Sequence, residues 1–212
     1  MSDISSPPRP TLPATAVADR QRSQRQIRPL ASWGATSLRL AFGIVFAINA
    51  VLKWLPGYRD SYLSQLKDVA QGQPSWLHGW FHFWVTLQSG APSFWADLTG
   101  VTETALALVL LLGVARRPGY LVGAGYMLLV WAVGEGFGGP YVSGSTDVGT
   151  GIIYTLLFLT MFVYAAPSLQ ERFSVDRLLA ARHAGWRRFA DLSIAKTDNG
   201  RGLTGITPSV SD

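Results

Sequence analysis

The 212-residue chain contains no cysteine, so disulfides, iron–sulfur clusters and thiolate metal sites are excluded for it. Charged residues are also scarce, at 15% of the sequence, whereas soluble domains carry about 25%. Hydrophobic residues reach 48%, and the mean hydropathy is positive, at +0.20. This composition is typical of a membrane protein, and we expect no nucleic-acid partner.

Four long apolar runs account for this composition. A helix of about 20 residues crosses a hydrocarbon core of about 30 Å, and a helix satisfies its own backbone hydrogen bonds in lipid. The sequence therefore predicts an all-α fold, a four-transmembrane-helix bundle within residues 36–166. The expected spans are residues 38–55, 94–114, 119–136 and 148–166.

The basic residues predict how these spans are oriented. Of the 18 Lys and Arg residues, 15 fall in the N-terminal segment, at the very start of the first run (Arg39), in the link between the second and third runs, or after the fourth run. Only Lys53, Arg59 and Lys67 fall on the other side. Because cytoplasmic loops are enriched in Lys and Arg, we expect both termini in the cytoplasm and the chain in the plasma (cytoplasmic) membrane, with membrane lipid as its first partner.

The remaining segments have distinct compositions. Residues 1–35 are basic and poor in acidic residues, which predicts a disordered cytoplasmic tail. Residues 167–190 mix apolar residues with arginines and predict a basic amphipathic helix on the cytoplasmic leaflet. Residues 191–212 are predicted to be a second disordered tail.

The first outer link, residues 56–93, is rich in aromatic residues. Trp76, Trp80 and Trp84 recur every four residues and would share one face of a helix. Tryptophan gathers at the boundary between membrane and water. The link is therefore predicted to contain an aromatic amphipathic helix that lies on or re-enters the outer leaflet.

Glu103 is the most informative single residue, because it lies near the middle of an apolar run. An ionisable group at that depth costs about 2.5–3.5 kcal/mol and normally faces the bundle interior with a partner. Depth makes Asn49 and Tyr154 the expected partners. The carboxylate either accepts protons or orients a ligand, or else it makes a structural hydrogen bond between helices.

A glycine-rich stretch, residues 134–151, joins the third and fourth runs. Glu135, Tyr141 and Asp147 would lie there beside exposed backbone, which predicts a pocket able to hold a polar head group. The alternative for Asp147 is that it caps the start of the fourth helix.

His78 and His82 are four residues apart in the aromatic link, a spacing that two metal ligands on a helix can have. Amphipathic histidines among tryptophans are the simpler interpretation, and we expect no metal site. No apolar run contains a histidine, and the chain carries no flavin motif, so we expect no haem and no flavin.

The first run contains Arg39, Gly43, Phe46 and Lys53, and in these residues the chain resembles the DoxX/DoxD family of small four-helix membrane proteins. The second run adds a lone glutamate before a leucine-rich stretch, a glycine and a basic pair. These residues are Glu103, Gly113, Arg116 and Arg117. Ala50 departs from the family pattern, which usually has glycine there.

The resemblance to the DoxD branch implies a membrane subunit of thiosulfate:quinone oxidoreductase, which passes electrons to membrane quinone together with a second small subunit. On this hypothesis Glu103, Glu135 and Asp147 are the catalytic carboxylates. The ligand pocket is formed by Asn49, Lys53, Tyr141 and Tyr154. The alternative is a non-catalytic anchor or assembly module of a redox or stress-response complex.

Overall fold

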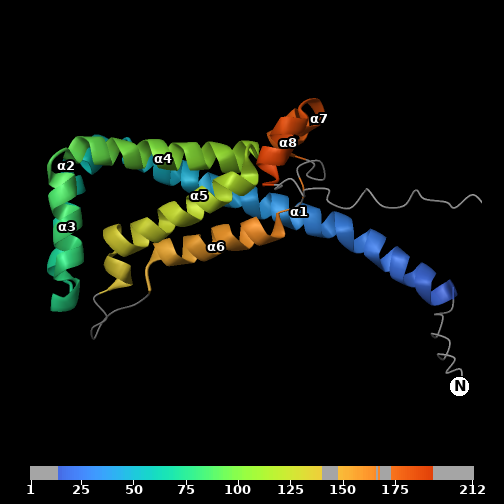
Figure 1. Ribbon diagram of the computed structural model, residues 1–212, viewed down its shortest axis with the longest axis horizontal. Helices are drawn as coiled ribbons and strands as arrows, with labels where there is room; N and C mark the ends of the chain where they lie inside the picture. Colours follow the sequence, from blue (N-terminus) through green and yellow to red (C-terminus); the bar gives the residue numbers. More distant parts are fainter. Residues whose placement is uncertain (1–13, 140–147, 166, 168–172, 193–212) are drawn as a thin grey trace, which may run out of the picture.

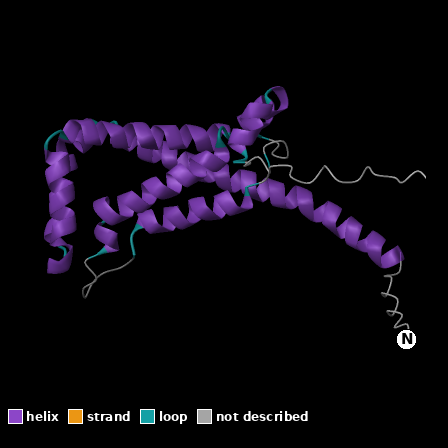
Figure 2. Cartoon of the chain, in the orientation of Figure 1, coloured by secondary structure: helices purple, strands orange, loops and turns teal. Residues whose placement is uncertain are grey.

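The computed structural model describes residues 14–139, 148–165, 167 and 173–192, with side chains described from residue 33 onward. Within these residues the chain forms helices and loops without a strand, as Figure 2 shows. The all-α class predicted from the sequence is confirmed. In chain order the elements are α1 (Ala14–Lys53), α2 (Pro56–Gln71), η1 (Ser75–Leu77), α3 (His78–Ser89), α4 (Pro92–Leu112), α5 (Arg116–Leu129), η2 (Val130–Gly134), η3 (Gly136–Gly138), α6 (Thr150–Tyr164), α7 (Val175–Arg182) and α8 (Ala184–Ala190).

Four helices, α1, α4, α5 and α6, run lengthwise through the molecule (Figure 1). Helix α1 packs mainly against α4, and α5 packs mainly against α6. Helices α2 and α3 lie at one end of this bundle, which we call the α2–α3 end; α7 and α8 lie at the opposite end, the α7–α8 end.

Two helical segments in the described part of the chain are long and apolar enough to cross a membrane. They are Trp33–Lys53, which is the second half of α1, and Pro92–Leu112, which is α4. Helix α6 is also apolar but has only 15 residues. Helix α5 has 14 residues and continues as the π-helical segment η2. The four-span arrangement remains a prediction.

Helix α1 begins at Ala14 and extends without interruption to Lys53. The helix therefore covers residues 14–35, for which the composition predicts a disordered tail. Alanine, arginine and glutamine are frequent there, and all three are good helix formers. A helix of 40 residues is about 60 Å long, so α1 projects well beyond the bundle at the α7–α8 end (Figure 1).

Aromatic side chains form the centre of the bundle core. Phe46 and Phe158 are at most 1% exposed, and their ring centroids lie 5.4 Å apart in an edge-to-face arrangement. Phe42 contacts both rings, with each pair of centroids 5.0 Å apart. These contacts join α1 to α6 and hold the two helix pairs together.

Glycines let the helices of the second half approach closely. A Cβ atom on Gly119 would lie 2.4 Å from Val109 of α4, and one on Gly123 would lie 2.5 Å from the ring of Phe158 of α6. The G-x-x-x-G spacing therefore serves packing within the chain, and its two glycines face different neighbours.

The segment at the α2–α3 end of α5 is a π-helix. π-Helical segments are rare in proteins overall, but those that occur are often at functional sites, because the wider turn disturbs the regular backbone hydrogen bonds. Here the indole Nε1 of Trp80 donates to the Ala132 carbonyl oxygen at 3.1 Å, which ties α3 to η2. The π-helix is thus anchored from outside, and it forms one wall of a cavity.

Candidate functional site

A cavity of about 390 Å³ lies at the α2–α3 end, with walls from α1, α2, α3, α4, α5 and η2. Its volume is in the range of small-molecule sites, which are about 300–1,000 Å³. The aliphatic wall is made of Leu66, Leu98, Leu129, Val130 and Val133. The aromatic wall is made of Tyr58, Tyr62, Trp84 and Trp95. A ligand with a flat, mostly apolar body would be enclosed on several sides.

Glu103 is the buried carboxylate of this cavity, with 7% of its surface exposed. Its Oε1 atom accepts a hydrogen bond from the Tyr126 hydroxyl at 3.0 Å, which joins α4 to α5. Its Oε2 atom is buried and has no hydrogen-bond partner among the described residues. A buried carboxylate oxygen without a partner is costly, so Oε2 is the position where a ligand hydroxyl would be most favourable.

Two further polar groups border the cavity. The indole Nε1 of Trp84 is buried and has no hydrogen-bond partner in the described part of the chain. Lys53 lies with its Nζ atom 4.3 Å from the centroid of the Tyr58 ring, a cation–π distance. The cavity therefore offers an acceptor at Glu103, a donor at Trp84 and a positive charge at Lys53.

The tyrosines of α2 border the cavity in their neutral form. Burial raises the pKa of Tyr58 to about 12, an effect that the hydroxyl of Thr99 partly offsets. Burial raises the pKa of Tyr62 as well. The Tyr62 hydroxyl donates to the Oε1 atom of buried Gln88 at 2.6 Å. Both tyrosines therefore keep their protons at physiological pH and can act as hydrogen-bond donors.

Glu135 lies at the rim of the cavity, at the end of the π-helical segment. Its Oε2 atom accepts a hydrogen bond from the backbone N–H of Gly151 at 2.8 Å, in the first turn of α6. A carboxylate at a helix N-terminus is favourable because it satisfies a free N–H and the helix dipole. Glu135 therefore connects the end of η2 to the start of α6 while it borders the cavity.

The residues chosen from the sequence fall into three groups. Glu103, Glu135 and Lys53 meet at the cavity. Asn49 and Tyr154, although described, do not line it, and Tyr154 packs instead against Phe42 in the core, with ring centroids 5.1 Å apart. Tyr141 and Asp147 lie outside the described residues.

The two histidines of the aromatic link lie apart from this cavity. The Nε2 atom of His78 lies 3.0 Å from the Gln73 carbonyl oxygen, whereas His82 is exposed. Among the described residues, no group of three or more His, Asp or Glu side chains is placed to hold a metal ion.

Tyr126, the partner of Glu103, is not among the residues expected from the sequence. Glu103 lies ten residues before Gly113, and Tyr126 lies ten residues after Arg116. In an antiparallel helix pair with a tight turn, residues equally far from the turn lie at similar depth. Equal distance from the turn therefore pairs Glu103 with Tyr126, whereas depth in the membrane alone points to Asn49 and Tyr154 on other helices.

The family model DoxX matches residues 34–136, a range that contains every residue lining the cavity. No curated protein and no solved structure matches the chain. The match supports the DoxX family, and together with the apolar helices it indicates a membrane protein.

Proposed function

We propose, taking the match to the DoxX family model as the premise, that this chain is the membrane subunit of a quinone-linked oxidoreductase. The cavity around Glu103 is then the site of the quinone head group. The observation that carries this proposal is the buried Oε2 atom of Glu103, which has no partner among the described residues and borders a cavity with aromatic walls.

The chemistry of the cavity fits a quinone. A quinone head group is a flat ring with oxygen atoms at its edge, so it requires aromatic or aliphatic walls and a few polar groups. The Trp84 N–H can donate to a ring carbonyl, and the Glu103 carboxylate can accept from the hydroxyl of the reduced form. The aliphatic and aromatic walls cover the ring faces.

Reduction of a quinone consumes two electrons and two protons. In its protonated form Glu103, held by the Tyr126 hydroxyl, can give one proton to a ring oxygen and then take up another from water for the second ring oxygen. Lys53 provides positive charge nearby. The electrons come from a separate donor molecule, and a partner subunit takes part in their transfer to the quinone. The resemblance to the DoxD branch makes thiosulfate the first donor to test.

Glu103→Gln is expected to weaken binding of a short-tailed ubiquinol by about tenfold, because a charge-assisted hydrogen bond becomes a neutral one. Any pH dependence of binding that comes from Glu103 should disappear, while that from Lys53 and Glu135 should stay. Trp84→Phe, which removes the indole N–H together with the pyrrole ring but keeps an aromatic side chain, should weaken binding of the oxidised form. Isothermal titration calorimetry on the full chain in neutral detergent measures both effects.

Tyr154→Phe is the matched control, because Tyr154 lies in the core and does not line the cavity. It should bind both forms as the parent does. If the parent binds no quinone, or if Glu103→Gln binds as tightly as the parent, the cavity is not a quinone site. The alternative hypothesis, a non-catalytic anchor or assembly module, is then favoured. If binding behaves as expected, thiosulfate-dependent quinone reduction in native membranes is the next assay.

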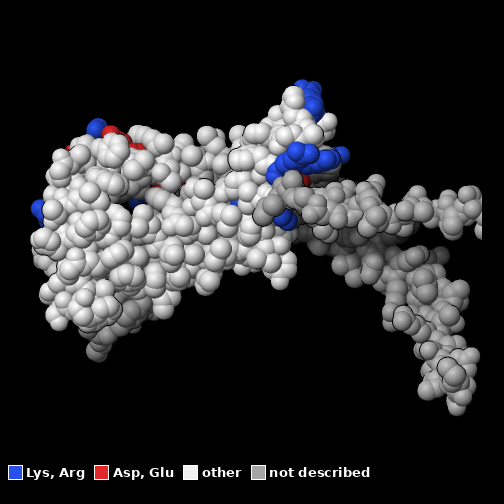
Figure 3. Space-filling model, in the orientation of Figure 1, with Lys and Arg blue, Asp and Glu red and all other residues white. Residues whose placement is uncertain are grey.

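We also propose that α1, α4, α5 and α6 span the membrane with the α7–α8 end in the cytoplasm. Basic side chains gather over that end in Figure 3, in agreement with the preference of Lys and Arg for the cytoplasmic side. Exposed Trp76 lies at the opposite end, where an aromatic belt is expected.

The absence of native cysteine allows a direct test of this orientation. Ser64→Cys on α2 and Gly185→Cys on α8 are both at exposed positions. A membrane-impermeant maleimide should label Ser64→Cys in intact cells and should label Gly185→Cys only after permeabilisation. The reverse labelling pattern would show that the chain has the opposite orientation. Labelling of both variants in intact cells would rule out the four-span arrangement.

A further inference from the structure

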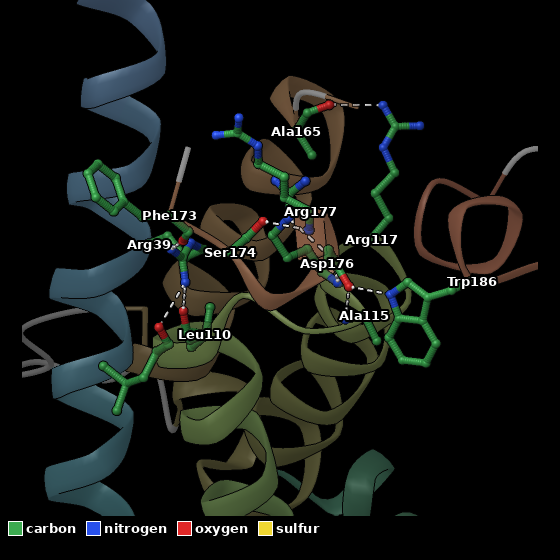
Figure 4. A network of polar contacts seen from close by, with 12 residues as sticks. Arg39, Leu110, Ala115, Arg117, Ala165, Phe173, Ser174, Asp176, Arg177 and Trp186 are labelled. Carbon is green, nitrogen blue, oxygen red and sulfur yellow. Dashed lines mark hydrogen bonds and ion pairs between the residues drawn. The ribbon is translucent and has the colours of Figure 1, made fainter. Parts of the chain in front are cut away.

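Helices α7 and α8 are fixed to the bundle by one fully buried carboxylate, that of Asp176, which is 0% exposed. Its Oδ1 atom accepts from the backbone N–H of Ala115 at 2.7 Å, and its Oδ2 atom accepts from the backbone N–H of Arg116 at 3.0 Å. The indole Nε1 of Trp186 in α8 donates to Oδ1 at 3.0 Å. Figure 4 shows Asp176 between Ala115, just before α5, and Trp186 of α8.

Three further contacts fix the same unit. The backbone N–H of Asp176 donates to the Gly113 carbonyl oxygen at 3.1 Å. Arg39 of α1 is buried and donates to the Phe173 carbonyl oxygen at 2.6 Å. Arg117 donates to the Asp191 carbonyl oxygen at 3.1 Å. The chain on both sides of α7 and α8 is therefore held by arginines of the bundle, and the two helices have a fixed position.

This anchoring leaves an outward surface of one charge sign. Within the described residues 173–192 the only acidic side chains are Asp176, which is fully buried, and Asp191, which is half-buried. We call the four exposed arginines the basic face; they are Arg177, Arg182, Arg187 and Arg188. Figure 3 shows Lys and Arg gathered over α7 and α8.

Exposed apolar side chains accompany the basic face. Leu178 of α7 is 67% exposed and Phe189 of α8 is 51% exposed. Val163 and Tyr164, at the end of α6 nearest to this unit, are 70% and 77% exposed. A surface that combines arginines with exposed Leu, Phe and Tyr at the end of apolar helices matches the boundary of a bilayer, where both kinds of side chain find partners.

We infer that the basic face binds the head groups of anionic lipids in the leaflet at the α7–α8 end. The arginines pair with lipid phosphates, and Leu178 and Phe189 enter the acyl boundary beside them. An acidic protein would match the charge of the surface but not its exposed apolar residues, which is why lipid is favoured. The inference does not depend on what the cavity around Glu103 binds.

The test is a titration of short-chain phosphatidylglycerol and phosphatidylcholine into the full chain in neutral detergent, with bound lipid counted by native mass spectrometry. The parent should bind phosphatidylglycerol in preference, and the preference should fall as salt is raised. Arg187→Gln combined with Arg188→Gln should weaken phosphatidylglycerol binding by about thirtyfold, since each basic residue near a leaflet contributes about fivefold.

The matched control is Arg59→Gln combined with Lys67→Gln, which removes the same charge from the α2–α3 end. This control should bind phosphatidylglycerol as the parent does. Equal binding of the two lipids by the parent would overturn the inference. So would an equal loss in the two double variants, because the effect would then follow net charge rather than the basic face. All the changed side chains are exposed, and elution as a single peak on size exclusion confirms that each variant is folded.

Discussion

Replacing Asp176 with alanine is expected to destabilise the protein by about 3–5 kcal/mol, the usual cost of removing one member of a buried ion pair. The change removes the carboxylate that two backbone N–H groups and one indole N–H share. It also leaves the guanidinium of Arg116, which is 3% exposed, without the carboxylate 3.4 Å from its Nε atom. Thermal unfolding in neutral detergent, followed by circular dichroism, measures the loss.

Two variants make this prediction specific. Asp176→Asn keeps one oxygen acceptor and the size of the side chain, so it should lose less stability than Asp176→Ala. Asp68→Asn removes an exposed carboxylate at the opposite end of the molecule and should change stability by less than about 0.5 kcal/mol. An Asp176→Ala variant as stable as the parent would show that α7 and α8 are not anchored through this residue.

Gly123→Ala is expected to destabilise the protein by about 1–3 kcal/mol, the usual cost of overpacking a core. Alanine is a better helix former than glycine by about 1 kcal/mol, so helix propensity alone would predict the opposite sign. The contact with Phe158 decides the outcome. A Cβ atom at position 123 would lie 2.5 Å, 2.6 Å and 2.8 Å from three atoms of the Phe158 ring. That ring is 0% exposed and is held by Phe42 and Phe46, so it cannot move away without cost.

Gly125→Ala on the same helix is the matched control, because a Cβ atom there would meet nothing within 4 Å. It should leave the melting temperature unchanged or raise it. Combining Gly123→Ala with Phe158→Leu should cost less than the sum of the two single changes, because the smaller side chain makes room for the new methyl group. Stabilisation by Gly123→Ala would mean that α5 and α6 are not in close contact at this point.

The sequence alone was sufficient for the properties that depend on composition and local pattern. The apolar runs predicted an all-α chain, and the family resemblance read from the first two runs agrees with the match to residues 34–136. The burial of Glu103 followed from its depth, because an ionisable side chain in lipid has to face the protein interior.

Residue pairings between distant segments could not be predicted in the same way. The spacing of Trp76, Trp80 and Trp84 predicts one interfacial helix face, because spacing alone does not show which indole is covered by neighbouring helices. In the structure Trp76 is 79% exposed, whereas the Nε1 atom of Trp84 is buried at the cavity. The choice depends on how α3 packs against α2 and α4, which periodicity does not specify.

The burial of Asp176 could not be predicted from the sequence for a related reason. Among the arginines of residues 167–190 it looks like an ordinary surface charge. The signal that could have revealed it lies about 60 residues earlier, at the start of α5. The N-cap position of α5 is Ala115, which has no side-chain acceptor for the first N–H groups of the helix. A buried helix start without a local cap requires an acceptor from elsewhere, and Asp176 supplies it.

The π-helical segment Val130–Gly134 limits which sequence changes the protein can tolerate during evolution. A π turn holds one residue more than an α turn, so the number of residues in it sets the direction, around the helix axis, in which the side chains after it point. A substitution within it preserves that rotation, whereas loss of one residue would turn Glu135 by about 100° away from Gly151. Among related chains we therefore expect the identity of these five residues to vary more freely than their number.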